Sequence, residues 1–368
     1  MAPGEIFFER FGHNAIVVAP ANGDEPTSYN FGFFDMAEPD FLGNFIRGRM
    51  RYMLVALPVA DDLESYRRSG RGVTMQWLDL DPGQARELAA ALADNARPEN
   101  SRYTYDYYTA NCSTRVRDAL DAALGGALRA QLSGPSRGLT YRSESVRLAW
   151  PAKWMATGFD VGLGGYADRP LSRWDEAFIP MRLRESLAGV RRADGRPLVG
   201  SEHEVLPHRI ASPPAELPRT AGAAFLAGLA LGVAALWGAR RHRRATAALA
   251  LAFWTLCGLV GTTILFVWFG TAHVAGHANH NVLLLSPLAF ALLPGGWAIV
   301  RGRAPSRRFD AWLWAVAGSA AVAAFLTFLP FLVQKNLAWV LLLLPLHLGL
   351  ARGFARPSPL VAASAAGP

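Results

Sequence analysis

Residues 103–118 read YTYDYYTANCSTRVRD, and they change in the middle from a strand-favouring pattern to a helical one. Its first half is aromatic and favours a strand, whereas apolar residues recur at helical spacing from Val116 onward. Asn111 is a preferred N-cap residue, so the pattern predicts a helix that begins at Cys112 with the cysteine on its buried side. Free amide N–H groups and the helix dipole lower the pKa of a thiol at that position, which makes Cys112 a candidate nucleophile. The other interpretation is a small, buried apolar residue.

A thiol nucleophile requires a base, and the best candidate is His13 in the sequence FGHNAIVV, residues 11–18. This histidine stands at the mouth of a short strand of β-branched residues. A turn rich in Pro, Gly, Asn and Asp follows at residues 20–27, and residues 28–34 return as a second strand. We therefore expect His13 to lie at one end of a β-hairpin.

The hairpin also offers a group to orient the imidazole. If Ala19 pairs with Ser28, His13 comes opposite the end of the second strand and Asp35 lies beside it. A carboxylate there would hold the imidazole and stabilise its charged form, as in a catalytic triad. Asn30 is the alternative orienting residue, and an Asp35 that merely ends the strand is the third interpretation.

Aromatic and basic residues alternate over residues 41–57, where Arg47, Arg49 and Arg51 stand among phenylalanines and tyrosine. We expect this segment to be a solvated face of the domain. Contact with lipid phosphates is the alternative interpretation.

Beyond residue 218 the sequence changes to long apolar stretches separated by short polar ones. Most of these stretches are long enough to cross the hydrocarbon core of a bilayer, so the chain is a membrane protein. Arginine clusters follow the first, third and fifth stretches. By the positive-inside rule these ends and the C-terminus are cytoplasmic, and the N-terminal part is outside. The five stretches are residues 220–239, 245–271, 281–300, 311–333 and 337–351.

The net charge of +8 follows largely from membrane topology, because many of the arginines flank the apolar stretches. No basic stripe interleaved with aromatic residues is visible, so a nucleic-acid partner is not expected. The second cysteine, Cys257, lies within an apolar stretch, and a disulfide with Cys112 is not expected. The first ten residues contain no basic segment followed by an apolar core, which a signal peptide would have. Since the topology places the N-terminal part outside the membrane, we expect an export segment upstream of these residues.

Four motifs occur in an order that resembles the Lnb family of bacterial lipoprotein N-acyltransferases. The motifs are FGHNA at 11–15, YNFGFFD at 29–35, NFIRGRMRY at 44–52 and YDYYTANCSTRVRD at 105–118. The segment GGYADRPLSRWDEAFIPMRL at 164–183 is also similar to the family. The resemblance implies an α+β, circularly permuted papain-like (NlpC/P60-type) extracytoplasmic domain, in which the catalytic histidine precedes the cysteine, followed by a five-helix transmembrane bundle.

These observations predict four parts. Residues 1–183 form the papain-like catalytic domain, residues 184–218 a linker, residues 219–356 the transmembrane domain and residues 357–368 a cytoplasmic tail. The polar loop after the second apolar stretch lies on the same side of the membrane as Cys112. There, His273, Asn279 and Asn281 are expected to bind a lipid headgroup or the acceptor. Three histidines in this loop lack an accompanying carboxylate or cysteine, so neither a metal nor another cofactor is expected.

Thiol-mediated acyl transfer is the function that these patterns favour. Cys112, deprotonated by His13, attacks an acyl ester of a membrane phospholipid to give a thioester. The resemblance implies that the lipidated N-terminal amine of a lipoprotein then takes the acyl chain. Two alternatives remain open: a membrane-anchored cysteine peptidase or amidase that acts on cell-wall peptides, and a non-enzymatic receptor or transport component.

Overall fold

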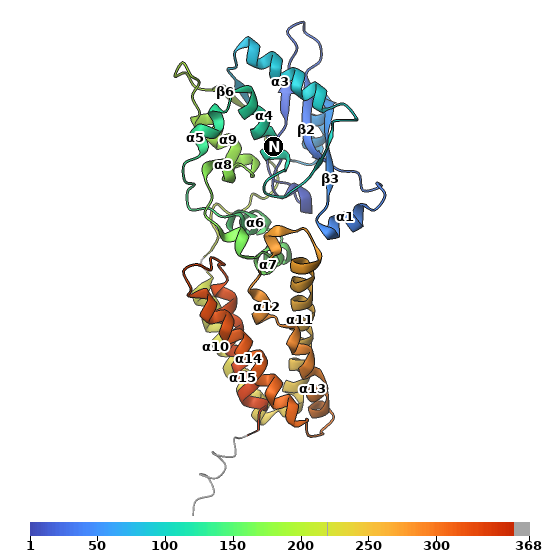
Figure 1. Cartoon of the computed structure of the whole chain (residues 1–368), viewed down its shortest axis with the longest axis vertical. Coiled ribbons are helices and arrows are strands. Elements are labelled where there is room, and N and C mark those ends of the chain that lie inside the picture. Colours follow the sequence, from blue (N-terminus) through green and yellow to red (C-terminus); the bar gives the residue numbers. More distant parts are fainter. Residues whose placement is uncertain (219, 357–368) are drawn as a thin grey trace, which may run out of the picture. The chain divides into compact units, whose positions relative to one another are not determined.

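The computed structural model describes residues 1–218 and 220–356, and the described chain forms two compact units. The first unit consists of residues 1–159 and 169–217, and the second of residues 160–168 together with the chain from residue 218 onward. The chain is therefore α+β in its first unit and helical in its second (Figure 1). The predicted cytoplasmic tail, residues 357–368, lies outside the described residues.

A four-stranded antiparallel sheet is the centre of the first unit, with strand order β1-β2-β3-β5. Its strands are β1 (Ile16–Val18), β2 (Thr27–Phe33), β3 (Arg51–Pro58) and β5 (Arg102–Thr104). The expected hairpin of β1 and β2 is present, but its register differs from the prediction. Val18 pairs with Thr27, whereas the prediction paired Ala19 with Ser28. A shift of two residues keeps every side chain on the same face, so the hydrophobic pattern does not distinguish the two registers.

Two helices pack on this sheet and on each other, α3 (Pro82–Asn95) and α4 (Cys112–Ala123) (Figure 1). α3 begins as the sequence indicates, with Asp81 and Gln84 forming a capping box and Pro82 at the first helical position. The core between the helices and the sheet is apolar and closely packed, so the start of α4 is held in a defined position. Its buried members include Phe31, Leu54, Leu88, Leu92, Val116, Leu120 and Leu183.

The predicted linker, residues 184–218, is largely part of the first unit. α9 (Pro180–Gly189) extends into it, and β6 (Val199–Leu206) pairs antiparallel with β4 (Val73–Leu78) to form a second sheet. The sequence of β6, VGSEHEVL, is polar because most of its side chains are exposed, and this polarity led to the linker assignment. Backbone pairing with an apolar partner strand, which composition does not reveal, determines its structure.

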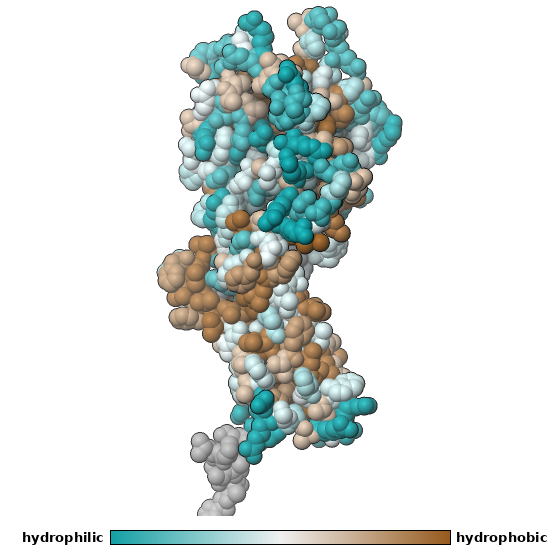
Figure 2. All heavy atoms as spheres, turned by 45° about the vertical axis from the view of Figure 1, so that its right-hand side comes forward, coloured by the Kyte–Doolittle hydropathy of each residue, from teal (hydrophilic) through white to brown (hydrophobic). Residues whose placement is uncertain are grey.

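The second unit contains five apolar segments long enough to cross a membrane. Four are continuous helices: α10 (Ala221–Arg241), α11 (Arg243–Gly270), α14 (Arg307–Thr327) and α15 (Leu337–Phe354). The remaining segment is broken into α12 (Asn281–Leu284), η4 (Pro287–Leu292) and α13 (Leu293–Val300), with prolines at the breaks. On the face that Figure 2 shows, apolar and weakly polar side chains cover most of these helices, and hydrophilic side chains gather at one end.

Small residues allow α10 and α15 to pack closely. A Cβ atom on Gly228 would stand 2.1 Å from the carbonyl oxygen of Leu341, and one on Gly232 would stand 2.5 Å from that of Pro345. The GxxxG pair is therefore a helix-packing surface. The remaining elements are η1 (Phe7–Glu9), α1 (Phe41–Arg47), α2 (Val59–Arg68), α5 (Ala127–Leu132), α6 (Tyr141–Ala149), α7 (Lys153–Gly162), η2 (Gly165–Asp168), α8 (Arg173–Glu176) and η3 (Val274–Gly276).

Candidate active site

Cys112 is the first residue of α4, as the sequence predicts. The side-chain oxygen of Asn111 accepts hydrogen bonds from the amides of Ser113 and Thr114, both at 2.9 Å, and caps the helix. The amide nitrogen of the Asn111 side chain donates to the carbonyls of Tyr107 and Phe178, both at 2.9 Å. The cap is therefore fixed from both sides, and the cysteine that follows it cannot shift independently of the core.

Strand β2 approaches the cysteine closely at Gly32. This glycine has φ +93° and lies at an irregularity in the pairing of β2 with β3. A Cβ atom on Gly32 would stand 3.5 Å from the Cβ of Cys112. The backbone conformation favours glycine here, because an L side chain is strained at this φ, whereas the distance of 3.5 Å is an ordinary van der Waals contact.

The Cys112 thiol is partly buried, and burial raises its pKa above the ordinary value. The amide N–H groups of Asn14, Ser113 and Cys112 itself point towards the sulfur and favour the thiolate, but they do not overcome the cost of desolvation. The prediction that the helix start lowers this pKa is therefore wrong, because burial outweighs the helix terminus. The same N–H groups are suitable donors for an oxyanion that forms next to the sulfur.

The segment that carries His13 is tied to the start of α4. The side-chain amide of Asn14 donates to the Ser113 hydroxyl at 3.0 Å, and that hydroxyl donates to the Ala177 carbonyl at 2.7 Å. His13 thus directly precedes a residue that contacts both Cys112 and Ser113. Two segments almost one hundred residues apart in the chain meet at this point.

A hydrogen-bond chain determines which nitrogen of His13 carries the proton. Nε2 of His13 lies 3.0 Å from Oδ1 of Asn30. The Asn30 side-chain nitrogen donates to a carboxylate oxygen of Asp62 at 3.2 Å and to the Ser28 hydroxyl at 3.0 Å. Since a carboxylate only accepts, the Asn30 amide is oriented with its oxygen towards the imidazole. His13 therefore donates from Nε2, and Nδ1 keeps the free lone pair that a base requires.

Burial lowers the pKa of His13 to about 4, and the hydrogen bond to Asn30 opposes this shift. The imidazole is therefore neutral at pH 7. Asn14, the next residue, donates its backbone N–H towards the Cys112 sulfur, so the segment that carries this neutral imidazole contacts the thiol. A neutral imidazole is the form that can accept a proton from a thiol when the sulfur attacks.

The structure brings Asn30 to His13 and leaves Asp35 elsewhere. Asp35 is exposed, and its carboxylate accepts the amide N–H of Ala37 at 2.8 Å. Asp62 on α2 accepts a hydrogen bond from Asn30, and the sequence pattern did not predict this residue as part of the site. Nothing in the pattern of α2 singles out Asp62, because the contact arises only when α2 packs against β2.

Tyr103 is a second residue that the sequence analysis passed over. Its hydroxyl is buried and bonds to no side chain within the described residues, and the backbone N–H of Gly32 points towards it. The hydroxyl lies 3.9 Å from the position that a Cβ on Gly32 would take, on the side of Gly32 that faces Cys112. Burial raises the pKa of Tyr103, so the group stays protonated and is available as a donor. The aromatic run before Cys112 is the only sequence signal for it.

Two family models match this chain. Residues 1–146 match the Lnb N-terminal periplasmic domain, and residues 219–355 match the Lnb transmembrane domain. The chain belongs to the Lnb family. No curated protein and no solved structure matches it.

Membership in the Lnb family, together with the five apolar segments, establishes a multi-pass inner-membrane protein with a periplasmic N-terminal domain. It also indicates a membrane enzyme that modifies lipoproteins. The matched regions cover the catalytic candidates His13 and Cys112 as well as the membrane helices.

The polar residues of the Lnb transmembrane domain form a buried network. The side-chain nitrogens of Asn279 and Asn281 both donate to the Val161 carbonyl, at 2.8 and 2.9 Å. Gln334 donates to the Asn279 side-chain oxygen at 2.8 Å, and Asn336 donates to that of Asn281 at 2.9 Å. The two asparagines expected to bind a headgroup thus use their amides to hold residues 160–168 against the helices.

His273 is half-buried, and its backbone amide donates to the Thr271 hydroxyl at 3.3 Å. His277 contacts the Thr271 carbonyl through Nε2 at 3.0 Å. Within residues 1–218 and 220–356, no group of three or more His, Cys, Asp or Glu side chains is placed to hold a metal ion.

Proposed function

We propose that this Lnb family protein transfers an acyl chain from a membrane phospholipid, through a thioester on Cys112, to the N-terminal amine of a lipoprotein. The observation that carries the proposal is the start of α4. There a cysteine lies under converging backbone N–H groups, and the neighbouring segment carries a neutral histidine held by Asn30. The site thus contains a nucleophile, a base and donors for an oxyanion, which are the groups that acyl transfer requires.

In the first step Nδ1 of His13 takes the thiol proton while the sulfur attacks the carbonyl carbon of the phospholipid ester. The negative charge on the carbonyl oxygen is stabilised by the amides at the start of α4. The intermediate collapses with cleavage of the ester C–O bond, and His13 returns the proton to the departing oxygen. The products are a thioester on Cys112 and a lysophospholipid.

In the second step the α-amino group of a lipid-modified N-terminal cysteine attacks the thioester carbonyl. His13 accepts a proton from the amine, the C–S bond breaks, and the proton returns to the sulfur. An amide forms, and the enzyme is restored without any external oxidant or energy source. Asn30 acts as a positioning residue in both steps because it keeps Nδ1 free.

The same reasoning supports a circularly permuted papain-like arrangement of the first unit. In support, the histidine precedes the cysteine, the cysteine begins a helix that packs on an antiparallel sheet, and an asparagine orients the histidine. For the membrane domain, we propose that the ends of α10, α13 and α15 are cytoplasmic, because arginines follow each of them.

The test is the intact mass of a lipoprotein produced in cells that lack other N-acyltransferases and express this chain. The wild-type protein should add the mass of one acyl chain, and Cys112→Ala should abolish the addition. Cys257→Ala is the matched control, because this second cysteine is buried in α11 and has no role in the proposed chemistry. An unchanged lipoprotein mass with inserted wild-type protein would refute acyl transfer, and peptide release would indicate a peptidase instead.

A further inference from the structure

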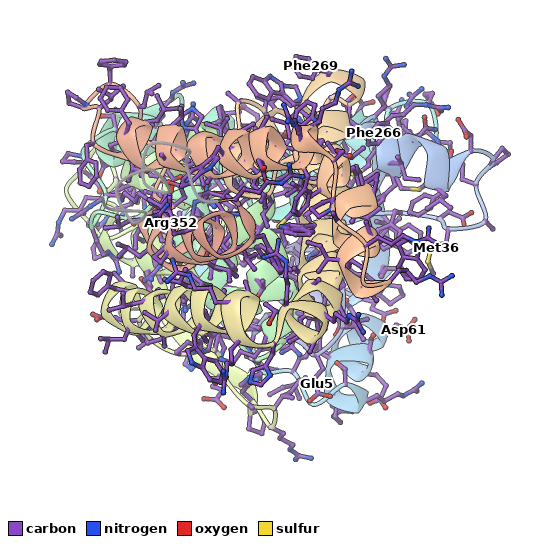
Figure 3. The ribbon with its side chains drawn as sticks, turned by 90° about the horizontal axis from the view of Figure 1, so that it is seen from below. Glu5, Met36, Asp61, Phe266, Phe269 and Arg352 are labelled. Carbon is purple, nitrogen blue, oxygen red and sulfur yellow. The ribbon has the colours of Figure 1, made fainter. Side chains whose placement is uncertain are left out.

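The first unit carries an apolar surface that its own core does not use. We call it the α1 ridge, and it consists of Phe7, Phe8, Met36, Leu42 and Ile46. These side chains are 41%, 52%, 72%, 67% and 46% exposed. They belong to η1, the loop after β2 and helix α1. Figure 3 labels Met36, whose side chain projects away from the ribbon.

Aromatic rings join the parts of the ridge into one surface. Phe8 packs on Phe34 with ring centroids 5.2 Å apart, and Phe34 stacks on Phe41 at 5.7 Å. Phe41 in turn stacks on Phe45 at 6.5 Å. This row of rings therefore links η1 to α1 through Phe34.

Charges of both signs flank the ridge, with Asp35, Glu38 and Asp40 close in the chain to Arg47, Arg49 and Arg51. Arg49 and Arg51 follow α1, are exposed, and form no ion pair within the described residues. The acidic side chains in the segment are engaged, since Asp40 pairs with Arg47 and Glu38 pairs with Arg102. Asp35 accepts the backbone amide of Ala37. Two free cations beside exposed apolar groups complement the anionic headgroups and acyl chains of a lipid surface.

We propose that the α1 ridge inserts into the headgroup region of the periplasmic membrane surface. A bilayer fits better than a protein partner, because the chain is already a membrane protein and the ridge combines apolar tips with adjacent arginines. η1 ends at Glu9, four residues before His13, so the ridge and the catalytic segment are parts of one continuous stretch. Insertion would hold the imidazole close to the lipid that supplies the acyl chain.

The test measures lipid contact in the full chain reconstituted in lipid nanodiscs. Cys112→Ser and Cys257→Ala remove the native thiols, and Leu42→Cys receives an environment-sensitive NBD fluorophore. Trp77→Cys is the matched control, because Trp77 is a similarly exposed apolar residue, 60% exposed, on β4. Lipids brominated on their acyl chains should quench the fluorophore at position 42 about twofold and leave position 77 unaffected.

Equal quenching at both positions, or full access of aqueous iodide to position 42, would overturn the inference. The labelled protein lacks its thiol, so this result does not depend on the proposed acyl transfer. In the chain that keeps Cys112, the double variant Leu42→Glu and Ile46→Glu should lower thioester formation from bilayer lipid several-fold. Labelling of Cys112 by a small soluble thiol reagent should remain unchanged, and loss of that labelling as well would show misfolding in place of lost lipid contact.

Discussion

Replacing Asn30 with alanine removes the acceptor for Nε2–H of His13, and the consequence can be worked out from the contacts. The lost hydrogen bond joins neutral partners, so its net contribution is about 1 kcal/mol, which corresponds to a rate change of roughly fivefold to tenfold. The substitution also frees the imidazole to carry its proton on Nδ1, where it no longer acts as a base. We therefore expect Asn30→Ala to lower the rate of thioester formation by about 10-fold to 100-fold.

The assay is single-turnover formation of the acyl-enzyme in nanodiscs, followed by intact mass. Asp35→Ala is the informative comparison, because a carboxylate beside the histidine was the first expectation from the sequence. Its carboxylate is bonded to the Ala37 amide, so the rate should change less than about twofold. Full activity of Asn30→Ala, or an equal loss in Asp35→Ala, would refute the assignment of Asn30 as the orienting residue.

Four further predictions concern the same site and the membrane domain. Because burial lowers the pKa of His13 to about 4, the base stays neutral down to that pH, and thioester formation should fall only as the pH drops through about 4; a midpoint near the ordinary 6.5 in a pH–rate profile would contradict it. The unfolded chain binds this proton at higher pH, so stability should decrease as the pH falls from 6.5 towards 4, as thermal unfolding at several pH values would show. Gly32→Ala should lower the free energy of unfolding by about 1–2 kcal/mol and slow thiol labelling of Cys112. The control Gly23→Ala has a similar φ of +84° and open space around it, so it should lower stability only. Identical labelling rates in the two variants would show that the approach of β2 to Cys112 is unimportant. Gly228→Ile should separate α10 from α15 and reduce the melting temperature in detergent, while Gly222→Ile, where a Cβ meets open space, should not; equal melting temperatures would show that this packing contributes little.

The start of α4 and the membrane helices could be predicted because their signals are local. Asn111 caps the helix at the residue that the pattern indicates, and four of the five long apolar stretches become continuous helices, whereas the third is broken at prolines. Both features depend on neighbouring residues in the chain, which is the information that a single sequence contains.

The features that escaped prediction depend on contacts between distant segments. The polar strand β6 becomes a strand only because β4 pairs with it, and Asp62 supports Asn30 only because α2 packs against β2. The pKa of the Cys112 thiol is a further case. The start of α4 favours the thiolate, but burial by the surrounding domain outweighs it and raises the pKa. Asn279 and Asn281 were expected to bind a lipid headgroup or the acceptor, yet both side chains are buried and donate hydrogen bonds to the Val161 carbonyl.

The most direct measurement is the intact mass of the purified full chain after incubation with phospholipid vesicles in the absence of an acceptor. Acyl transfer through Cys112 predicts a mass increase equal to one acyl chain, released by neutral hydroxylamine as a thioester should be, and lost in Cys112→Ala but kept in Cys257→Ala. An unmodified protein under conditions that support lipoprotein N-acylation, or an adduct that persists in Cys112→Ala, would contradict the central claim.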